Sequence, residues 1–159
     1  MTKTRKGFTL VELLIVIIII GILAAAMLLS SASASASADA SNVVSNLRAL
    51  KSASLLWYAD KNNMASITIP TITDVETYMD NPSKLYGYSF VANAADGAWW
   101  ISCDLATANI SSSADEVAFK LAGKKTAIGL YGAPVLKNTM TANKGDFLAT
   151  QSVVYMIAH

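Results

Sequence analysis

The residue types that most often carry catalysis or bind metals are sparse in this chain. Cys103 is the single cysteine and His159 the single histidine among 159 residues. A lone cysteine forms no intramolecular disulfide and no zinc or iron–sulfur site, and a terminal histidine is poorly placed to hold a metal or a nucleophile. Asp74, Glu76 and Asp80 lack the spacing of a calcium loop and are interpreted as a solvated face. We therefore expect no enzyme, metal or cofactor, and interpret Cys103 as a small apolar side chain at a strand end.

The residue whose position does suggest chemistry is Glu12. It lies inside an almost continuously apolar stretch, residues 8–29, which has about the ~20 residues that a helix needs to cross a bilayer. An ionisable side chain costs roughly 2.5–3.5 kcal/mol near the centre of such a helix. Two interpretations of Glu12 follow: its carboxylate reaches the cytoplasmic headgroups, or a partner charge neutralises it.

Three positive charges, Lys3, Arg5 and Lys6, precede the apolar stretch. Positive flanks stay in the cytoplasm, so we expect a single-pass precursor in the cytoplasmic membrane with everything after the helix on the other side. Without these three, nine of the 12 basic residues remain against 11 acidic ones. The remainder has no basic stripe, and its composition gives nucleic-acid binding no support.

Three interpretations of the N-terminal segment compete. It could be a plain signal anchor, or a secretory signal peptide of a secreted or membrane-tethered binding domain. Residues 30–40, SSASASASADA, offer A-x-A cleavage sites such as Ala34-Ser35-Ala36. However, the apolar run is longer than a signal-peptide h-region of roughly 7–15 residues, and it contains Glu12. The third interpretation takes the whole pattern together: basic leader, glycine, a short motif ending in glutamate, and an apolar helix.

That pattern resembles the class III leader of type IV prepilins and of type II secretion pseudopilins. The matching residues are Lys6-Gly7-Phe8-Thr9-Leu10-Val11-Glu12-Leu13-Leu14 and Ile20-Gly21-Ile22-Leu23-Ala24. The resemblance implies that a prepilin peptidase cuts between Gly7 and Phe8 and methylates the new amine of Phe8. It also implies an inner-membrane assembly platform and a filament built from this chain or other pilins. The proline that many family members have near Leu29 is missing, so a proline-linked kink is not carried over.

The resemblance gives Glu12 a physical purpose. Cleavage after Gly7 would create a positive amine on Phe8, and in a staggered stack of helices this amine can meet Glu12 of a neighbouring subunit. Removing one partner of such a buried pair typically costs ~3–5 kcal/mol, so Glu12 is interpreted as a registry device for an extracytoplasmic filament. A pilus is favoured over a type II secretion pseudopilus, because the major pseudopilin often has an acidic calcium site at its C-terminus and the last fifteen residues here contain only Asp146 among acidic residues.

The elements that position these residues begin with a long helix. Its second half has an apolar stripe at helical spacing, with two further apolar residues beside it: Val43, Leu47, Leu50, Ser54 and Trp57, then Val44 and Leu55. Asp60-Lys61-Asn62-Asn63 reads as the helix end. The serine/alanine segment 30–41 is expected to continue the helix, the alternative being a flexible linker. One helix then runs from about Phe8 to Asn62.

The rest of the chain predicts short helices and strands. Thr73-x-x-Glu76 and Ser113-x-x-Glu116 are capping-box patterns, the second opening a helix that ends at Gly123. Strands are expected at 85–91, 98–103, 126–131 and 147–157, the first two as a hairpin turning at 93–97. The first strand is expected to place Tyr86, Tyr88 and Phe90 on one face, and the second to place Trp99 and Trp100 on opposite faces.

The predicted fold class is therefore α+β: a long N-terminal helical spine packed against a small antiparallel sheet, the arrangement that pilins show. The expected divisions are a cleaved leader (1–7), a membrane and filament-core helix (8–29), a Ser/Ala-rich segment with the amphipathic half of the helix (30–63), and a globular head (64–159).

Overall fold

The computed structural model describes residues 7–61, 69–80, 85–92, 99–132 and 147–158. The chain divides into two compact units, Met1–Ala34 and Ser35–His159. Lys3, Arg5 and Lys6 lie outside the described residues, as do Asn62, the hairpin turn at 93–97, Asp146 and His159.

The long helix is α1, Leu10–Asp60. The serine/alanine segment lies within it, so the prediction of a helix there is confirmed and the flexible linker is not observed. All five residues of the predicted apolar stripe are buried, and burial extends back to Ala36 and Ala40. Leu55, which was expected beside the stripe, is 40% exposed, because it follows Ser54 by one residue and a helix turns about 100° over that step.

The globular unit contains one antiparallel sheet in the order β1-β2-β4-β3. Its strands are β1 (Tyr88–Ala92), β2 (Trp99–Asp104), β3 (Tyr131–Gly132) and β4 (Val153–Ile157). The predicted hairpin is confirmed, with Phe90 opposite Ile101. The central strand β2 also pairs with β4, placing Cys103 opposite Val154. The α+β, pilin-like architecture predicted from the sequence is therefore present.

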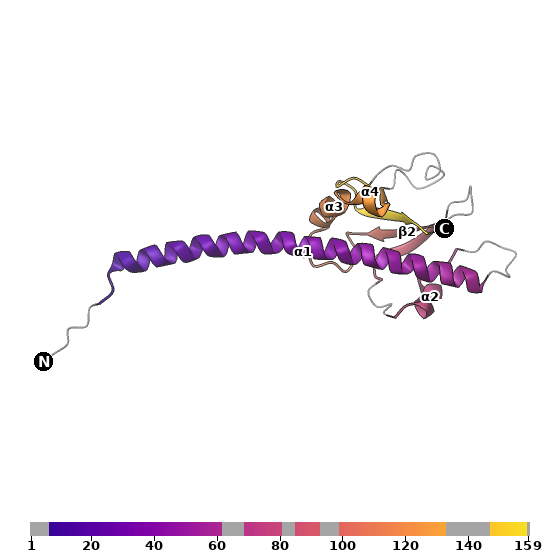
Figure 1. The fold of residues 1–159 in the computed structure, drawn as a ribbon, viewed down its shortest axis with the longest axis horizontal. Helices are drawn as coiled ribbons and strands as arrows, with labels where there is room; N and C mark the ends of the chain where they lie inside the picture. The colour runs from indigo at the N-terminus through magenta and orange to yellow at the C-terminus, as the bar shows by residue number, and fades with distance from the viewer. Residues whose placement is uncertain (1–6, 62–68, 81–84, 93–98, 133–146, 159) are drawn as a thin grey trace. The chain divides into compact units, whose positions relative to one another are not determined.

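The short helices are α2 (Ile72–Val75), the 3-10 turn η1 (Glu76–Tyr78), α3 (Ala114–Ala122) and α4 (Lys125–Ile128). In Figure 1, α2 is drawn on one side of the C-terminal part of α1, and α3 and α4 on the other. Ser113 caps α3 by accepting from the Glu116 amide, and Gly123 ends the helix, as predicted.

Three local predictions are wrong. The capping box is Thr71 with Asp74 rather than Thr73 with Glu76, because Pro70 holds the chain extended just before Thr71. Tyr86 lies outside β1, since Gly87 turns the chain at φ +85° just before the strand begins.

The expected strand over 126–131 is also wrong: most of it is the helical turn α4, closed by Gly129 in the left-handed conformation. Only Tyr131 and Gly132 pair with β4. The strand predicted over 147–157 is shorter than expected and begins at Val153.

The two tryptophans lie on opposite faces of β2 as predicted, and both are buried within the unit. Trp99 joins the core formed with α1, its ring 5.3 Å from that of Tyr58. Trp100 makes an edge contact with Tyr131, also at 5.3 Å between ring centroids. Neither tryptophan is available as an exposed subunit contact.

Candidate processing and assembly site

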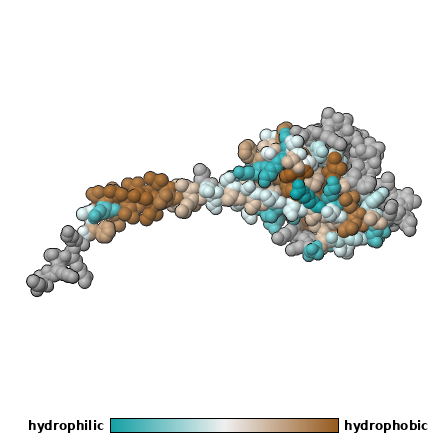
Figure 2. All heavy atoms as spheres, in the orientation of Figure 1, coloured by the Kyte–Doolittle hydropathy of each residue, from teal (hydrophilic) through white to brown (hydrophobic). Residues whose placement is uncertain are grey.

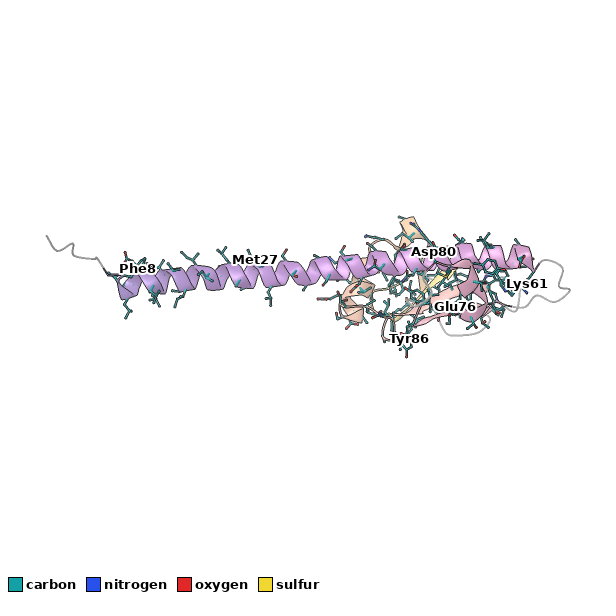
Figure 3. The ribbon with its side chains drawn as sticks, turned by 90° about the horizontal axis from the view of Figure 1, so that it is seen from below. Phe8, Met27, Lys61, Glu76, Asp80 and Tyr86 are labelled. Carbon is teal, nitrogen blue, oxygen red and sulfur yellow. The ribbon has the colours of Figure 1, made fainter. Side chains whose placement is uncertain are left out.

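The N-terminal part of α1 presents a surface of exposed apolar side chains. Phe8 is 85% exposed, Ile22 65% and Met27 72%, and the large apolar side chains between them are exposed as well. Figure 2 shows this surface as an almost unbroken hydrophobic zone, and Figure 3 shows the side chains standing out from the helix between Phe8 and Met27. By length and composition, α1 is the one helix among the described residues that could span a membrane.

Glu12 lies in the first turn of this helix and is hydrogen-bonded locally. Its Oε2 accepts from the Thr9 amide at 2.8 Å and from the Thr9 hydroxyl at 2.7 Å. In return, the Glu12 amide donates to the Thr9 hydroxyl at 3.3 Å. These reciprocal bonds form a capping box, which satisfies amide groups that a helix start otherwise leaves without partners.

Thr9 is the residue of this site whose role the sequence analysis missed. The signal was available, because Thr9-x-x-Glu12 is the capping-box pattern immediately before an apolar run. The cost of burying Glu12 in a membrane suggested a partner on a neighbouring subunit, whereas the structure shows Thr9 as a partner within the same turn. All the hydrogen bonds of the carboxylate go to Oε2, so its Oε1 has no hydrogen-bond partner among the described residues.

The predicted cleavage position precedes the helix. Gly7 and Phe8 lie outside α1, which begins at Leu10. Gly7 is exposed, and a Cβ added to it would meet nothing within 4 Å. Proteases cut preferentially at exposed segments outside helices and strands, and Gly7 and Phe8 lie in such a segment. Thr9 and Glu12 both lie C-terminal to the predicted cut, so the capping box would survive it.

In the globular unit, the described residues contain no group of three or more His, Cys, Asp or Glu that could hold a metal ion. Cys103 is buried in β2, and burial raises the pKa of its thiol to about 12. The thiol is therefore protonated at neutral pH and unreactive as a nucleophile, in line with its interpretation as a small apolar side chain.

Asp39 and the loop before α3 form a contact that the sequence did not reveal. Asp39 is 8% exposed, and its carboxylate accepts from the amides of Ser111 at 2.9 Å and Ser112 at 2.8 Å. The Ser112 hydroxyl also donates to the Ser35 hydroxyl at 3.1 Å. This part of α1 is thus fastened to the rest of the globular unit near the first buried residue of its stripe, Ala36.

Comparison with known families identifies the N-terminal segment. Residues 2–28 match the family model of the prokaryotic N-terminal methylation motif. This match confirms the resemblance to the prepilin-type signal of type IV pilins and pseudopilins. No curated protein and no solved structure matches the chain.

Proposed function

We propose that this chain, which carries the prokaryotic N-terminal methylation motif, is a structural subunit of a type IV pilus-like extracytoplasmic filament. A prepilin peptidase cuts between Gly7 and Phe8 and methylates the amine of Phe8. The mature subunit then enters the filament from the cytoplasmic membrane through its N-terminal helix. The observation that carries this proposal is the match at residues 2–28, which overlaps the N-terminal part of α1, where the large apolar side chains are exposed.

The exposed helix supports assembly because such a surface is unstable in water. A large apolar side chain left exposed forgoes roughly 1.5–3 kcal/mol of burial free energy. Lipid covers this surface in the precursor, and neighbouring copies of the same helix would cover it in a filament. Both environments suit one sequence, because lipid tails and aliphatic side chains are equally apolar.

Glu12 supplies the registry of this assembly. One carboxylate oxygen is held by Thr9, and the other is available to accept from the amine on Phe8 of an adjoining subunit. The negative carboxylate and the positive amine neutralise each other in an apolar environment where either alone is costly. A subunit inserted one helical turn out of place leaves both charges unpaired, which favours the correct register.

The structure also bears on the alternative of conventional secretion. The A-x-A sites at 34–40 lie within α1, with Ala36 and Ala40 each 1% exposed. Cleavage at these sites would remove Ser35, which contacts the Ser112 hydroxyl, or Asp39, which binds the loop before α3. A signal peptidase site of this kind would damage the globular unit, which favours cleavage at Gly7.

Two measurements test this proposal: the N-terminal residue of the mature chain and the filament yield of Glu12→Ala. With a prepilin peptidase present, we expect intact mass and N-terminal sequencing to show a chain that starts at methylated Phe8. Glu12→Ala should be cut normally but lower the filament yield by ~100-fold or more, because an uncompensated charge costs ~3–5 kcal/mol. Asp115→Ala, which removes an exposed carboxylate of the globular unit instead, is the control and should assemble. A mature chain starting within 34–40, or normal filaments from Glu12→Ala, would contradict the proposal.

A further inference from the structure

The globular unit has two grooves of opposite charge on the two flanks of α1. The first, which we call the basic groove, consists of two adjoining hollows of about 310 and 400 Å³ that share Arg48 and Ile128. Its charged lining residues are Arg48, Lys51 and Lys124, and among the described residues no acidic side chain lines either hollow. Val44, Ile128 and Met156 supply its apolar wall.

The second, the acidic groove, has a volume of about 370 Å³, and Asp80 is the charged residue that lines it in the part of the chain that the structure describes. Tyr78 also lines it, and the Tyr78 hydroxyl donates to Asp60 at 2.8 Å, which places a second carboxylate at its edge. Lys61 follows Asp60 in the chain and offsets part of this charge. Leu56, 56% exposed, and Met79 give this groove an apolar lining. Asp80 and Lys61 are labelled in Figure 3.

The two grooves face different directions because of the helix period. Arg48 and Lys51 lie on one side of the buried stripe of α1, and Ala49, Ser52 and Leu56, which line the acidic groove, lie on the other. At 100° per residue, the centres of the two sets are about 100° apart around the helix axis. One subunit therefore cannot bring its own grooves together, but two copies can.

We propose that the basic groove of one subunit binds the acidic groove of a second copy, and that this contact joins globular units in the filament. Two different surfaces of one chain make a heterologous contact, which repeats into an open helical assembly when it does not close. Opposite charges select this pairing over like-with-like contacts. A nucleic acid would account for the basic groove alone, whereas a second copy accounts for both. The inference rests on the proposed filament function and adds the surfaces used.

The test reverses each groove separately and then mixes the products. Arg48→Glu/Lys51→Glu makes both grooves acidic, and Asp60→Lys/Asp80→Lys makes both basic. We expect each full-length variant alone to form filaments at about one-tenth of the wild-type yield or less, because like charges then face each other. Co-expressed, the two variants should assemble in alternation and restore the yield. Asp115→Lys/Glu116→Lys reverses two charges that line neither groove, and is the control that should assemble normally.

A second readout separates this inference from the proposed function. A carbodiimide joins a lysine amine to a carboxylate in contact with it, so purified chains in detergent should give cross-linked dimers from wild type and from the mixture, but not from either variant alone. Cross-links that follow this pattern without wild-type filaments would uphold the contact and refute the filament. Wild-type filaments would uphold the proposed function. The contact between the grooves would be refuted if either reversed variant formed filaments alone, or if the two variants, both folded, failed to assemble together. Reversal of the basic groove that spares filaments but abolishes retention of double-stranded DNA would assign the groove to nucleic acid instead.

Discussion

Replacing Asp39 tests how the globular unit is fastened to α1. Asp39 is 8% exposed, and both hydrogen bonds of its carboxylate, at 2.9 and 2.8 Å from the amides of Ser111 and Ser112, go to the same oxygen. A hydrogen bond to a charged group contributes roughly 1.5–3 kcal/mol. Asp39→Ala removes two of them and leaves two amides without a partner. Part of this loss is offset because a largely buried charge is also removed, so we expect a net loss of about 3 kcal/mol in the free energy of unfolding.

Asp39→Asn separates the charge from the geometry. The side-chain carbonyl of asparagine can take the place of the accepting oxygen and retain both bonds at neutral strength, where each is worth about 1 kcal/mol. We therefore expect Asp39→Asn to lose less than half of what Asp39→Ala loses. Ser112→Ala is the matched control, because it removes only the exposed hydroxyl contact to Ser35 and should cost less than about 1 kcal/mol.

The assay is thermal unfolding of the full chain in detergent, followed by tryptophan fluorescence. All three tryptophans, Trp57, Trp99 and Trp100, lie in the globular unit, so the membrane helix does not contribute to the signal. A loss of about 3 kcal/mol should lower Tm by roughly 10 °C for a unit of this size. The explanation of this contact would be refuted by an Asp39→Ala variant whose Tm lies within about 2 °C of wild type. It would also be refuted if Asp39→Asn proved as destabilising as Asp39→Ala.

Two further predictions concern the turn before β1 and the interior of β2. Gly87→Ala should lower the free energy of unfolding by roughly 1–3 kcal/mol, because the glycine has φ +85° and the added Cβ would lie 2.7 Å from the Ala108 amide nitrogen. Chemical denaturation measures this loss. Gly123→Ala is the control, because the atom nearest to its added Cβ is 3.6 Å away. Burial raises the pKa of Cys103 to about 12, so above pH ~8.5 the unfolded chain loses this proton while the folded chain keeps it. Stability from this group is complete below pH ~8.5 and is lost as pH rises toward 12, with roughly 2 kcal/mol gone by about pH 10. Cys103→Ala should flatten that part of the Tm–pH profile, and an unchanged slope would show that the thiol does not titrate in this way.

The parts of the fold that the sequence predicted are those with long, regular patterns. The apolar stripe of α1 repeats over four turns, and its five residues are all buried, because a period sustained that long leaves little choice of face. The hairpin was also predictable, since two strands close in sequence pair with little loop-closure entropy. At the N-terminus, the sequence motif predicts Gly7, Phe8 and Glu12 as the candidate site.

Short signals with two possible readings were less reliable. Thr71-x-x-Asp74 and Thr73-x-x-Glu76 both fit a capping box, and only Pro70 distinguishes them. Thr126 and Ile128 favour a strand by propensity, but the chain forms the helical turn α4 there, which Gly129 closes. Such weak local preferences are readily overridden by tertiary packing.

Specific polar contacts between distant segments could not be predicted. Asp39 binds amides that are 72 and 73 residues further along the chain. Neither a serine-rich loop nor a single aspartate has a sequence pattern that predicts this contact. The two grooves are of the same kind, since each combines residues of α1 with residues more than twenty positions away.

The capping box between Thr9 and Glu12 has a kinetic consequence for the proposed filament. Because these bonds already hold the first turn of α1, a subunit would reach the growing end with its helix start formed rather than frayed. The conformational entropy of that turn, about 1–2 kcal/mol per residue, is then lost before docking instead of during it. A frayed start would have to order while it docks, which lowers the fraction of productive encounters. In the proposed filament, Thr9 would therefore govern how fast subunits add, and Glu12 which register they keep.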